Sequence, residues 1–316
     1  MGEPPFPIIA RSLLKGQVVP LLGAGASVGS RPSGAEWDAK AAQFLPRGSE
    51  LATFLATASS FPSDDKHDRG DLAKVASYFV DTSGRKDLRE YLCDIFDRNF
   101  EVSEIHRFLA ELSVPQLIVT TNYDDLIERA FAEAGKPFDL VVHPTDRKEV
   151  EASVLWWEWK HRVDGPRIVT PNELVIDLET TTVIYKMHGS VDRMLGKWHS
   201  YVVTEEDYID FLSRMTNSTA VPALFASHFR RRHFLFLGYG LGDWNFRVVL
   251  KNLETPLPGQ VSAAGDEETE EERKSWAIQY QPSKLEQELW GARDVNIYDL
   301  DINEFTRQLR QAVQKA

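Results

Sequence analysis

Cysteine is almost absent from the 316-residue sequence, because Cys93 is the only one. A single thiol excludes a disulfide within the chain and a zinc site built from several cysteines. Long hydrophobic runs are absent as well, since no stretch approaches the ~18 consecutive apolar residues typical of a membrane-spanning helix. The first residues, MGEPPFPIIARSLLKG, lack the basic start and small-residue cleavage site of a signal peptide. We therefore expect a cytoplasmic protein without a membrane segment.

Positive charge is also scarce. The 36 Lys and Arg residues are outnumbered by 48 Asp and Glu residues, which gives a formal net charge of -12. This balance argues against nucleic-acid binding as the main activity, because that activity depends on a basic surface; Arg230-Arg231-Arg232-His233 is the local exception. Apolar residues are abundant at 42%, so the chain can bury a globular core. Its length fits two domains, or one large α/β domain that carries an insertion.

Short apolar runs alternate with helical patterns along the chain. The apolar runs predict strands at 17–22, 116–120, 138–142, 182–187, 234–237, 276–280 and 295–298. Most of these strands are uniformly apolar, which is typical of parallel strands covered on both faces. The predicted fold class is therefore α/β, with a Rossmann-type, mostly parallel sheet, helices on both faces and a helical insertion.

The predicted organisation divides the chain into a core, an insertion and a loop. Apolar residues recur at intervals of three and four in residues 35–112, which predicts a helical insertion module. Residues 17–30 and 115–316 would form the Rossmann-type core, and the charged stretch 262–274 is predicted to be an acidic mobile loop. Three tryptophans, Trp156, Trp157 and Trp159, follow neither a helical nor a strand period. They could pack inside the protein or form a contact between copies of the chain.

Glycines follow the first predicted strand, in the sequence GAGAS at 23–27. In open parallel sheets, ligands bind outside the carboxyl ends of the strands, where such loops lie. Gly23 permits a tight turn, and Gly25 lets the backbone approach a phosphate that amide N–H groups can bind. The strict dinucleotide fingerprint G-x-G-x-x-G fails, however, because Val28 occupies the place of its third glycine. A plain glycine turn between strand and helix explains this loop equally well.

Two further residues at strand ends have functional and structural interpretations. The amide of Asn122 can donate to a ligand oxygen and accept from a water or a ribose hydroxyl, but asparagine at such a junction also caps helices. His188 ends the strand of KMHGS, where a histidine with a near-neutral pKa can act as a general base. A hydrogen-bonded strand-end histidine is the alternative. The other histidines show no ligand spacing, so we predict no metal, and Asp243 is expected to cap a helix.

Taken together, four ordered motifs resemble the sirtuin-like domains of bacterial NAD-consuming defence proteins. The motifs are GAGAS, IVTTNYDDLIERAF, YKMHGS and FLFLGYGLGDWNFR, and the similarity extends roughly from Gln17 to Asp299. The resemblance implies one sirtuin-like domain over 1–316 with a Rossmann-type NAD-binding sheet. It also implies that Asn122 and His188 form the catalytic pair. The NAD-binding residues that it implies are Gly23, Ala24, Gly25 and Ser27 at the phosphates, Asp124 on the ribose side, Gly238 and Tyr239 at the adenosine half, and also Thr121.

The sequence departs from protein-deacylating sirtuins in two respects. Those proteins carry a four-cysteine zinc module, which one cysteine cannot supply. Their first motif continues into an Ile-Pro-Asp-Phe-Arg-like stretch, whereas the stretch from Val28 to Trp37 of this sequence resembles the glycohydrolase branch. We therefore predict an NAD glycohydrolase that cleaves NAD, as substrate, to nicotinamide and ADP-ribose in an anti-phage defence system. An NAD-dependent deacylase and a non-catalytic NAD or ADP-ribose sensor are the alternatives.

The predicted partners follow from the same resemblance and from the composition. A second copy of the chain is expected because of the tryptophan-rich segment. A HerA-like ATPase, or another defence subunit, is a further candidate partner. Neither a nucleic acid nor a membrane is expected to bind directly.

Overall fold

The computed structural model describes residues 2–32, 34–41, 43–145, 150, 152–216, 221–240 and 274–316. A central sheet dominates this part of the chain, with strand order β11-β10-β9-β1-β2-β6-β3-β4-β5. Its strands are β1 (Val18–Leu22), β2 (Leu117–Thr120), β3 (Asp139–Val142), β4 (Val154–Trp157), β5 (Arg167–Val169), β6 (Val183–Lys186), β9 (His233–Leu237), β10 (Ser275–Gln279) and β11 (Val295–Asp299). From β11 to β3 every neighbouring pair is parallel, which confirms the predicted mostly parallel sheet.

Strand residues alternate between two hydrophobic clusters, one on each face of the sheet. In β1, Val18 and Leu22 point to one cluster, whereas Val19 and Leu21 point to the other. Because both faces are buried, the strand is apolar at every position instead of at every second one. This burial explains why the uniformly apolar runs predicted the central strands correctly.

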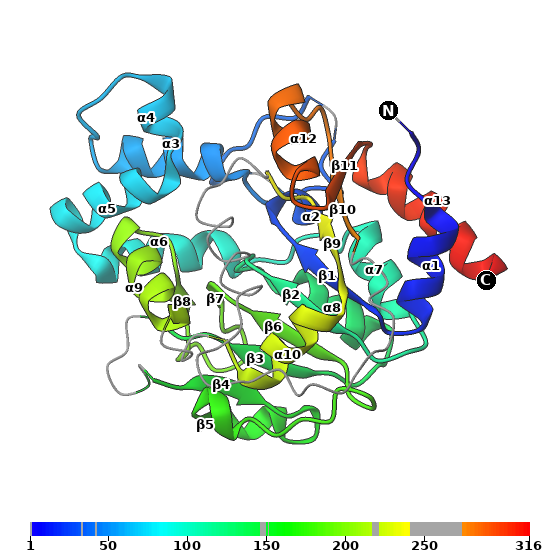
Figure 1. Cartoon of the computed structure of the whole chain (residues 1–316). Helices are drawn as coiled ribbons and strands as arrows, with labels where there is room; N and C mark the ends of the chain where they lie inside the picture. Colours follow the sequence, from blue (N-terminus) through cyan, green and yellow to red (C-terminus); the bar gives the residue numbers. More distant parts are fainter. Residues whose placement is uncertain are drawn as a thin grey trace.

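Helices cover both faces of the sheet (Figure 1). The first cluster receives side chains from α1 (Phe6–Leu14), α7 (Glu104–Glu111), α8 (Leu126–Glu133) and α13 (Ile302–Lys315). The second receives them from α9 (Glu205–Thr216), α10 (Ala223–Arg231) and α12 (Lys284–Gly291). Two 3-10 helices, η2 (Trp159–Asp164) and η3 (Pro171–Glu173), and a short hairpin of β7 (Gly189–Ser190) and β8 (Ser200–Tyr201) complete the core.

The segment between β1 and β2 is largely helical, as the three-and-four spacing predicted. It contains α2 (Ala24–Ser27), α3 (Gly48–Ala58), α4 (Lys66–Gly70), α5 (Leu72–Ser83) and α6 (Arg85–Phe96), followed by α7. Helices α3 to α6 gather at one side of the sheet, next to α9 (Figure 1). An ion pair of 2.8 Å between Arg85 and Asp207 links this helical module to the start of α9. Asp207 also accepts from the backbone N–H of Thr204 at 2.9 Å, at the N-terminus of α9.

Strands β4 and β5 are the part of the sheet that the sequence did not reveal. β4 pairs antiparallel with β3, and β5 pairs antiparallel with β4 and is the last strand at that edge. Trp156 and Trp157 are neighbours in β4, yet both are buried, because β4 is covered on both faces. Two adjacent buried tryptophans give neither a strand nor a helix period. Internal packing therefore accounts for these two residues, whereas Trp159 is 37% exposed.

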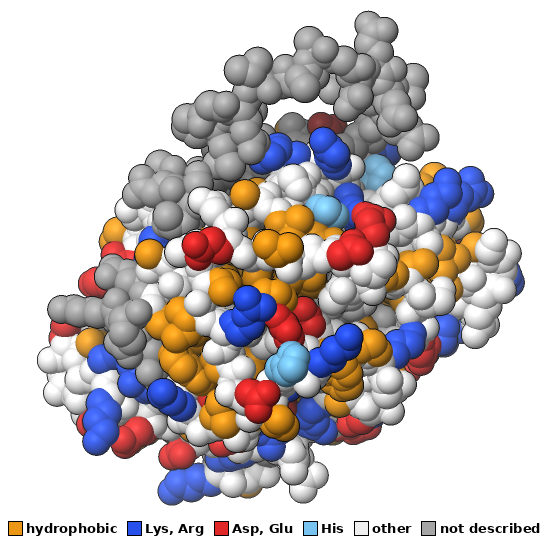
Figure 2. Space-filling view, turned by 90° about the horizontal axis from the view of Figure 1, so that it is seen from below, with side chains coloured by type: hydrophobic (Ala, Val, Ile, Leu, Met, Phe, Trp, Pro, Cys, Tyr) orange, Lys and Arg blue, Asp and Glu red, His pale blue; other side chains and the backbone are white. Residues whose placement is uncertain are grey.

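Some sequence predictions lie outside the described residues. They include residues 262–273 of the predicted acidic loop and the cap expected at Asp243. Within the described part, no helix is both long enough and apolar enough to cross a lipid bilayer. On the face seen in Figure 2, basic and acidic side chains are interspersed among apolar ones. The described side chains on that face form no extended surface of one charge.

Candidate active site

Three loops that follow β1, β2 and β9 meet at the carboxyl end of the sheet. The first contact is between the glycine loop after β1 and the loop after β9, where the Gly25 amide donates to the Gly238 carbonyl at 2.8 Å. A Cβ atom at Gly25 would lie 2.7 Å from the Gly238 Cα, and one at Gly238 would lie 2.2 Å from the Ala26 nitrogen. Gly238 also has a φ of +72°, a conformation that side chains disfavour. Glycine is required here because two backbones approach each other.

The predicted site residues come together around one cavity of about 170 Å³ at this end of the sheet. Seven of the ten predicted residues line it: Ala24, Ser27, Thr121, Asn122, Asp124, His188 and Tyr239. The other three, Gly23, Gly25 and Gly238, form the close contact between the loops. A hydrogen bond of 3.1 Å between the Thr121 and Tyr239 hydroxyls joins the loop after β2 to the loop after β9. The carboxyl end of the sheet thus gathers residues that are far apart in the sequence.

Asn122 is held by the glycine loop and does not cap α8. Its Nδ2 donates to the Gly23 carbonyl and to the Ser27 hydroxyl, both at 2.9 Å. A carbonyl can only accept, so the amide nitrogen must face Gly23, and both of its hydrogens are then in use. The remaining capacity is the acceptor Oδ1. The side chain can therefore accept from a water or a sugar hydroxyl, while its donors serve to fix its orientation.

Asp124 is connected to Asn122 through the Ser27 hydroxyl. Its Oδ2 accepts from the Ser27 hydroxyl at 2.8 Å, and its Oδ1 accepts from the Leu126 amide at 3.1 Å, at the start of α8. Burial raises the pKa of the Asp124 carboxyl to about 6, and the nearby Lys186 ammonium and the Ser27 hydroxyl oppose that rise. At neutral pH the carboxylate is ionised and fixes the Ser27 hydroxyl, which in turn accepts from Asn122.

His188 reaches the cavity from the loop after β6. Its ring is 8% exposed and contacts two aromatic rings of α9, Tyr208 and Phe211, each with a centroid distance of 5.4 Å. Burial lowers the pKa of His188 to about 4, although the Asp207 carboxylate opposes this effect. The near-neutral pKa expected from the sequence is therefore wrong for this structure. The imidazole is uncharged at pH 7 and able to accept a proton, but it is a weaker base than expected.

Several residues that line the cavity were not singled out from the sequence. The helical module contributes Leu45, Pro46, Gly48, Leu51, Leu72 and Phe96, and the core adds Tyr123 and Tyr208. These residues are mostly apolar, and they enclose the polar groups of the three loops. Apolar helix residues carry no signal that separates cavity walls from core, so only the fold reveals them.

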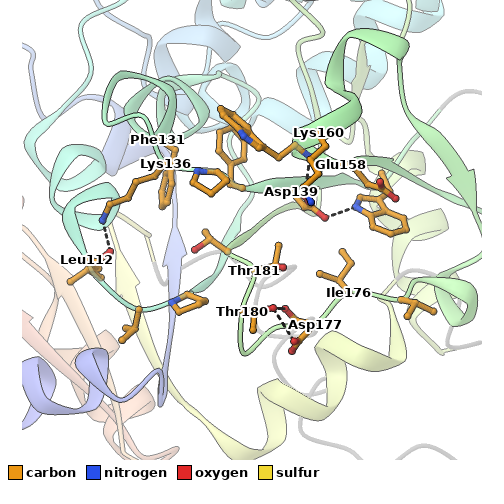
Figure 3. Close-up of a pocket in the computed structure, with 18 of the residues that line it drawn as sticks. Leu112, Phe131, Lys136, Asp139, Glu158, Lys160, Ile176, Asp177, Thr180 and Thr181 are labelled. Carbon is orange, nitrogen blue, oxygen red and sulfur yellow. Dashed lines mark hydrogen bonds between the residues drawn. The ribbon is translucent and has the colours of Figure 1, made fainter.

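A larger cavity, of about 520 Å³, lies at the opposite end of the strands (Figure 3). Its walls include residues just before β2 and β6 and at the start of β3, so it opens at the amino ends of these strands. None of the ten predicted residues is among its lining. Two of the polar groups labelled in Figure 3 have local partners: Lys136 donates to the Leu112 carbonyl at 2.6 Å, and Asp139 accepts from the Trp156 indole at 2.9 Å.

Among the described residues, no group of three or more His, Cys, Asp and Glu side chains is placed to hold a metal ion. Two buried histidines, His143 and His188, contact the same Phe211 ring, with centroid distances of 5.1 and 5.4 Å. A further buried histidine, His106, pairs with the Ser103 hydroxyl at 2.8 Å.

Comparison with known proteins adds a family and several relatives. Residues 116–298, which are more than half of the chain, match the family model described as a SIR2-like domain. The NAD(+) hydrolase ThsA of Enterococcus faecium is 30% identical over 199 residues, which cover 61% of this chain and 34% of that protein. ThsA of Cytobacillus dafuensis is 27% identical over 190 residues (60% and 31%), and defense-associated sirtuin 2 of Bacillus subtilis is 23% identical over 190 residues (60% and 16%). The chain spans about a third of the length of the ThsA relatives, and less of the third protein.

Proposed function

The chain belongs to the SIR2-like domain family, and from this premise we propose that it is an NAD glycohydrolase of an anti-phage defence system. It would cleave NAD to nicotinamide and ADP-ribose. One observation carries the proposal: Asn122 and His188 line the same cavity at the carboxyl end of the sheet, together with Ser27, which accepts from Asn122, and Asp124, which accepts from Ser27. Three relatives, two of them NAD(+) hydrolases ThsA and one of them defense-associated sirtuin 2, support it.

The chemistry suits a site that orients groups more than it activates them. Nicotinamide in NAD is a cationic leaving group, so cleavage of its bond to ribose needs little acid assistance and passes through an oxocarbenium-like state. Asn122 Oδ1 would accept from a ribose hydroxyl or the attacking water, because both Nδ2 hydrogens are already bound. His188, uncharged at neutral pH, would take the proton released by that water or hydroxyl.

The same proposal assigns the rest of the NAD molecule. The loop of Gly23, Ala24, Gly25 and Ser27 would lie at the phosphates, and Gly238 and Tyr239 would face the adenosine half. The Gly23 amide donates to the Leu237 carbonyl and the Gly25 amide to that of Gly238. These two glycines would therefore act by permitting the close approach of the loops, while Ala24 and Ser27 face the cavity directly.

Product analysis tests this function against its enzymatic alternative. Purified protein is incubated with NAD, with and without an acyl-lysine peptide and with and without extract of phage-infected cells, and products are separated by mass-resolved chromatography. We expect nicotinamide and ADP-ribose without any peptide. Turnover that strictly depends on the acyl-lysine would favour the deacylase. NAD that binds but stays intact under all four conditions would favour the sensor.

Assembly and location belong to the proposal as well. We propose that the protein acts in the cytoplasm and self-associates, with a HerA-like ATPase or another defence subunit as a further partner. Exposed apolar side chains on and beside the β5 edge support self-association: Trp159, Val163, Ile168 and Val175 are 37%, 78%, 48% and 80% exposed. Light scattering at micromolar concentration checks this, and a monomer with and without NAD would contradict it.

A further inference from the structure

Lys186 is a charged residue at the end of an otherwise apolar central strand, β6, two residues before His188. Its side chain is fully buried, with a relative exposure of 0%. A buried ammonium is costly unless each of its hydrogens finds an acceptor. Lys186 Nζ has three oxygen partners: Glu128 Oε1 at 2.9 Å, the Tyr123 carbonyl at 3.4 Å and the Asp124 carbonyl. The number of acceptors matches the three hydrogens of the ammonium group.

Two of those three acceptors belong to the loop that carries Asn122. Tyr123 and Asp124 follow Asn122 directly, so the ammonium holds the backbone on the side of the loop away from the glycine loop. The opposite side is held through the Asn122 side chain, which donates to Gly23 and Ser27. The Val191 amide adds a third constraint, because it donates to the same Tyr123 carbonyl at 2.9 Å. The loop after β2 is therefore fixed from two sides.

We propose that Lys186 is a positioning residue for NAD cleavage, whose ammonium holds the Tyr123 and Asp124 carbonyls and so sets the orientation of Asn122. The inference rests on the proposed function, since it concerns the same reaction. Glu128, on α8, balances the buried charge without contacting the cavity, because it is absent from the cavity lining. Lys186 thus holds the loop, and Glu128 neutralises the charge of Lys186.

The charge of Lys186 has a second effect, on Asp124. The ammonium opposes the rise in the pKa of the buried Asp124 carboxyl, whereas the Glu128 carboxylate adds to that rise. The other groups that bear on Asp124 are the Ser27 hydroxyl and the Leu126 amide, and both stabilise its ionised form. Loss of the ammonium should therefore raise the pKa of Asp124 and move any rate dependence on its ionisation to higher pH.

A purely structural ion pair and a positioning residue predict different behaviour for matched variants. The double variant Lys186→Met/Glu128→Met replaces both charges by apolar side chains, an exchange that often preserves stability. The single variant Glu128→Gln keeps Lys186 and its two carbonyl contacts. Both variants are compared with the wild-type chain by turnover of NAD, by pH–rate profile and by hydrogen exchange.

We expect the double variant to fold and to lose about 10- to 100-fold in kcat, because misplaced groups impair orientation while substrate contacts remain. Its acid limb should move to higher pH, because the Lys186 ammonium affects the pKa of Asp124 more than the Glu128 carboxylate does. Amide exchange should accelerate at Asn122 and Leu126 while β9 and β10 are unchanged. Glu128→Gln should keep kcat within about threefold, since the loop stays held.

Three results would overturn the proposal. The first is wild-type kcat in a folded double variant, the second is unchanged exchange at Asn122 and Leu126, and the third is an equal loss of kcat in Glu128→Gln. If the double variant does not fold, Lys186→Gln is measured in its place with the same readouts. Wild-type protein that never cleaves NAD would instead refute the proposed function. The exchange data would still decide whether Lys186 holds the loop.

Discussion

The two cavities at opposite ends of the strands differ both in volume and in the polar groups that line them, and the smaller one is the candidate active site. The amino-end cavity, about 520 Å³, is roughly three times larger than the carboxyl-end cavity, about 170 Å³. In the larger one, Lys136 and Asp139 are bound by neighbouring backbone and indole groups. In the smaller one, Asn122 and His188 arrive from different loops and keep acceptor capacity towards the cavity. Convergence of polar groups, not volume, marks the candidate site.

The largest expected effect comes from removing a convergent group. Asn122→Ala and His188→Ala should each lower NAD turnover by ~10²–10⁴-fold, because each loses an orienting or proton-accepting group. Lys136→Met, at the amino-end cavity, is the matched control and should stay within about twofold of wild type. Turnover and melting temperature are measured on the same preparations. An active but destabilised Asn122→Ala variant would mean that the residue serves the fold alone.

A smaller effect is expected where the loops of the carboxyl-end site touch. In Gly238→Ala, the new Cβ would meet the Ala26 nitrogen at 2.2 Å in a left-handed conformation. We expect a loss of roughly 2–5 kcal/mol in the free energy of unfolding, from backbone strain and overpacking together. Gly291→Ala, whose Cβ would meet nothing within 4 Å, is the control. Equal melting temperatures for the two variants would refute the close contact.

The contact between these glycines is an example of a feature that the sequence alone does not predict. The strands β1, β2, β6 and β9 could be predicted because uniform apolar runs report burial on both faces. The residues around Trp156 and Trp157 could not, because adjacent buried side chains in β4 have no period. Gly25 was expected to approach a phosphate, but in the structure its nearest neighbour is Gly238, 213 residues later. Contacts of that kind depend on the strand order, which no local pattern contains.

The residues of the candidate site could be predicted from the sequence, but the hydrogen bonds between them could not. Four ordered motifs were enough to select Asn122 and His188. That Ser27 lies between Asn122 and Asp124, 97 residues from the latter, could not be inferred from either loop. Lys186 did carry a signal, namely a lysine in a buried strand, but its partners became evident only from the packing of β6 against α8.

The smallest expected effect is a dependence on pH at the carboxyl-end site alone. Asp124 is an acid whose pKa is raised to about 6, so it becomes protonated as the pH falls through that value. The protonated carboxyl accepts less well from Ser27, so the rate should fall below about pH 6. Asp124→Asn should be slower and should lack this acid limb. A limb that persists in Asp124→Asn would assign the titration to another group.

A chelator is expected to have no effect on the protein. Because the sequence shows no ligand spacing and a single cysteine, we expect folding and turnover to be unchanged by EDTA. Metal analysis of the purified protein is the check, and stoichiometric zinc would contradict the expectation.

The most direct test of which cavity binds NAD is a crystal structure of the Asn122→Ala variant soaked with NAD. The substitution should slow cleavage enough to trap the intact dinucleotide. We predict that the nicotinamide ribose lies in the carboxyl-end cavity, next to His188 and Ser27, and that the amino-end cavity holds no dinucleotide. Density for NAD between Lys136 and Asp139, with the carboxyl-end cavity unoccupied, would contradict the account.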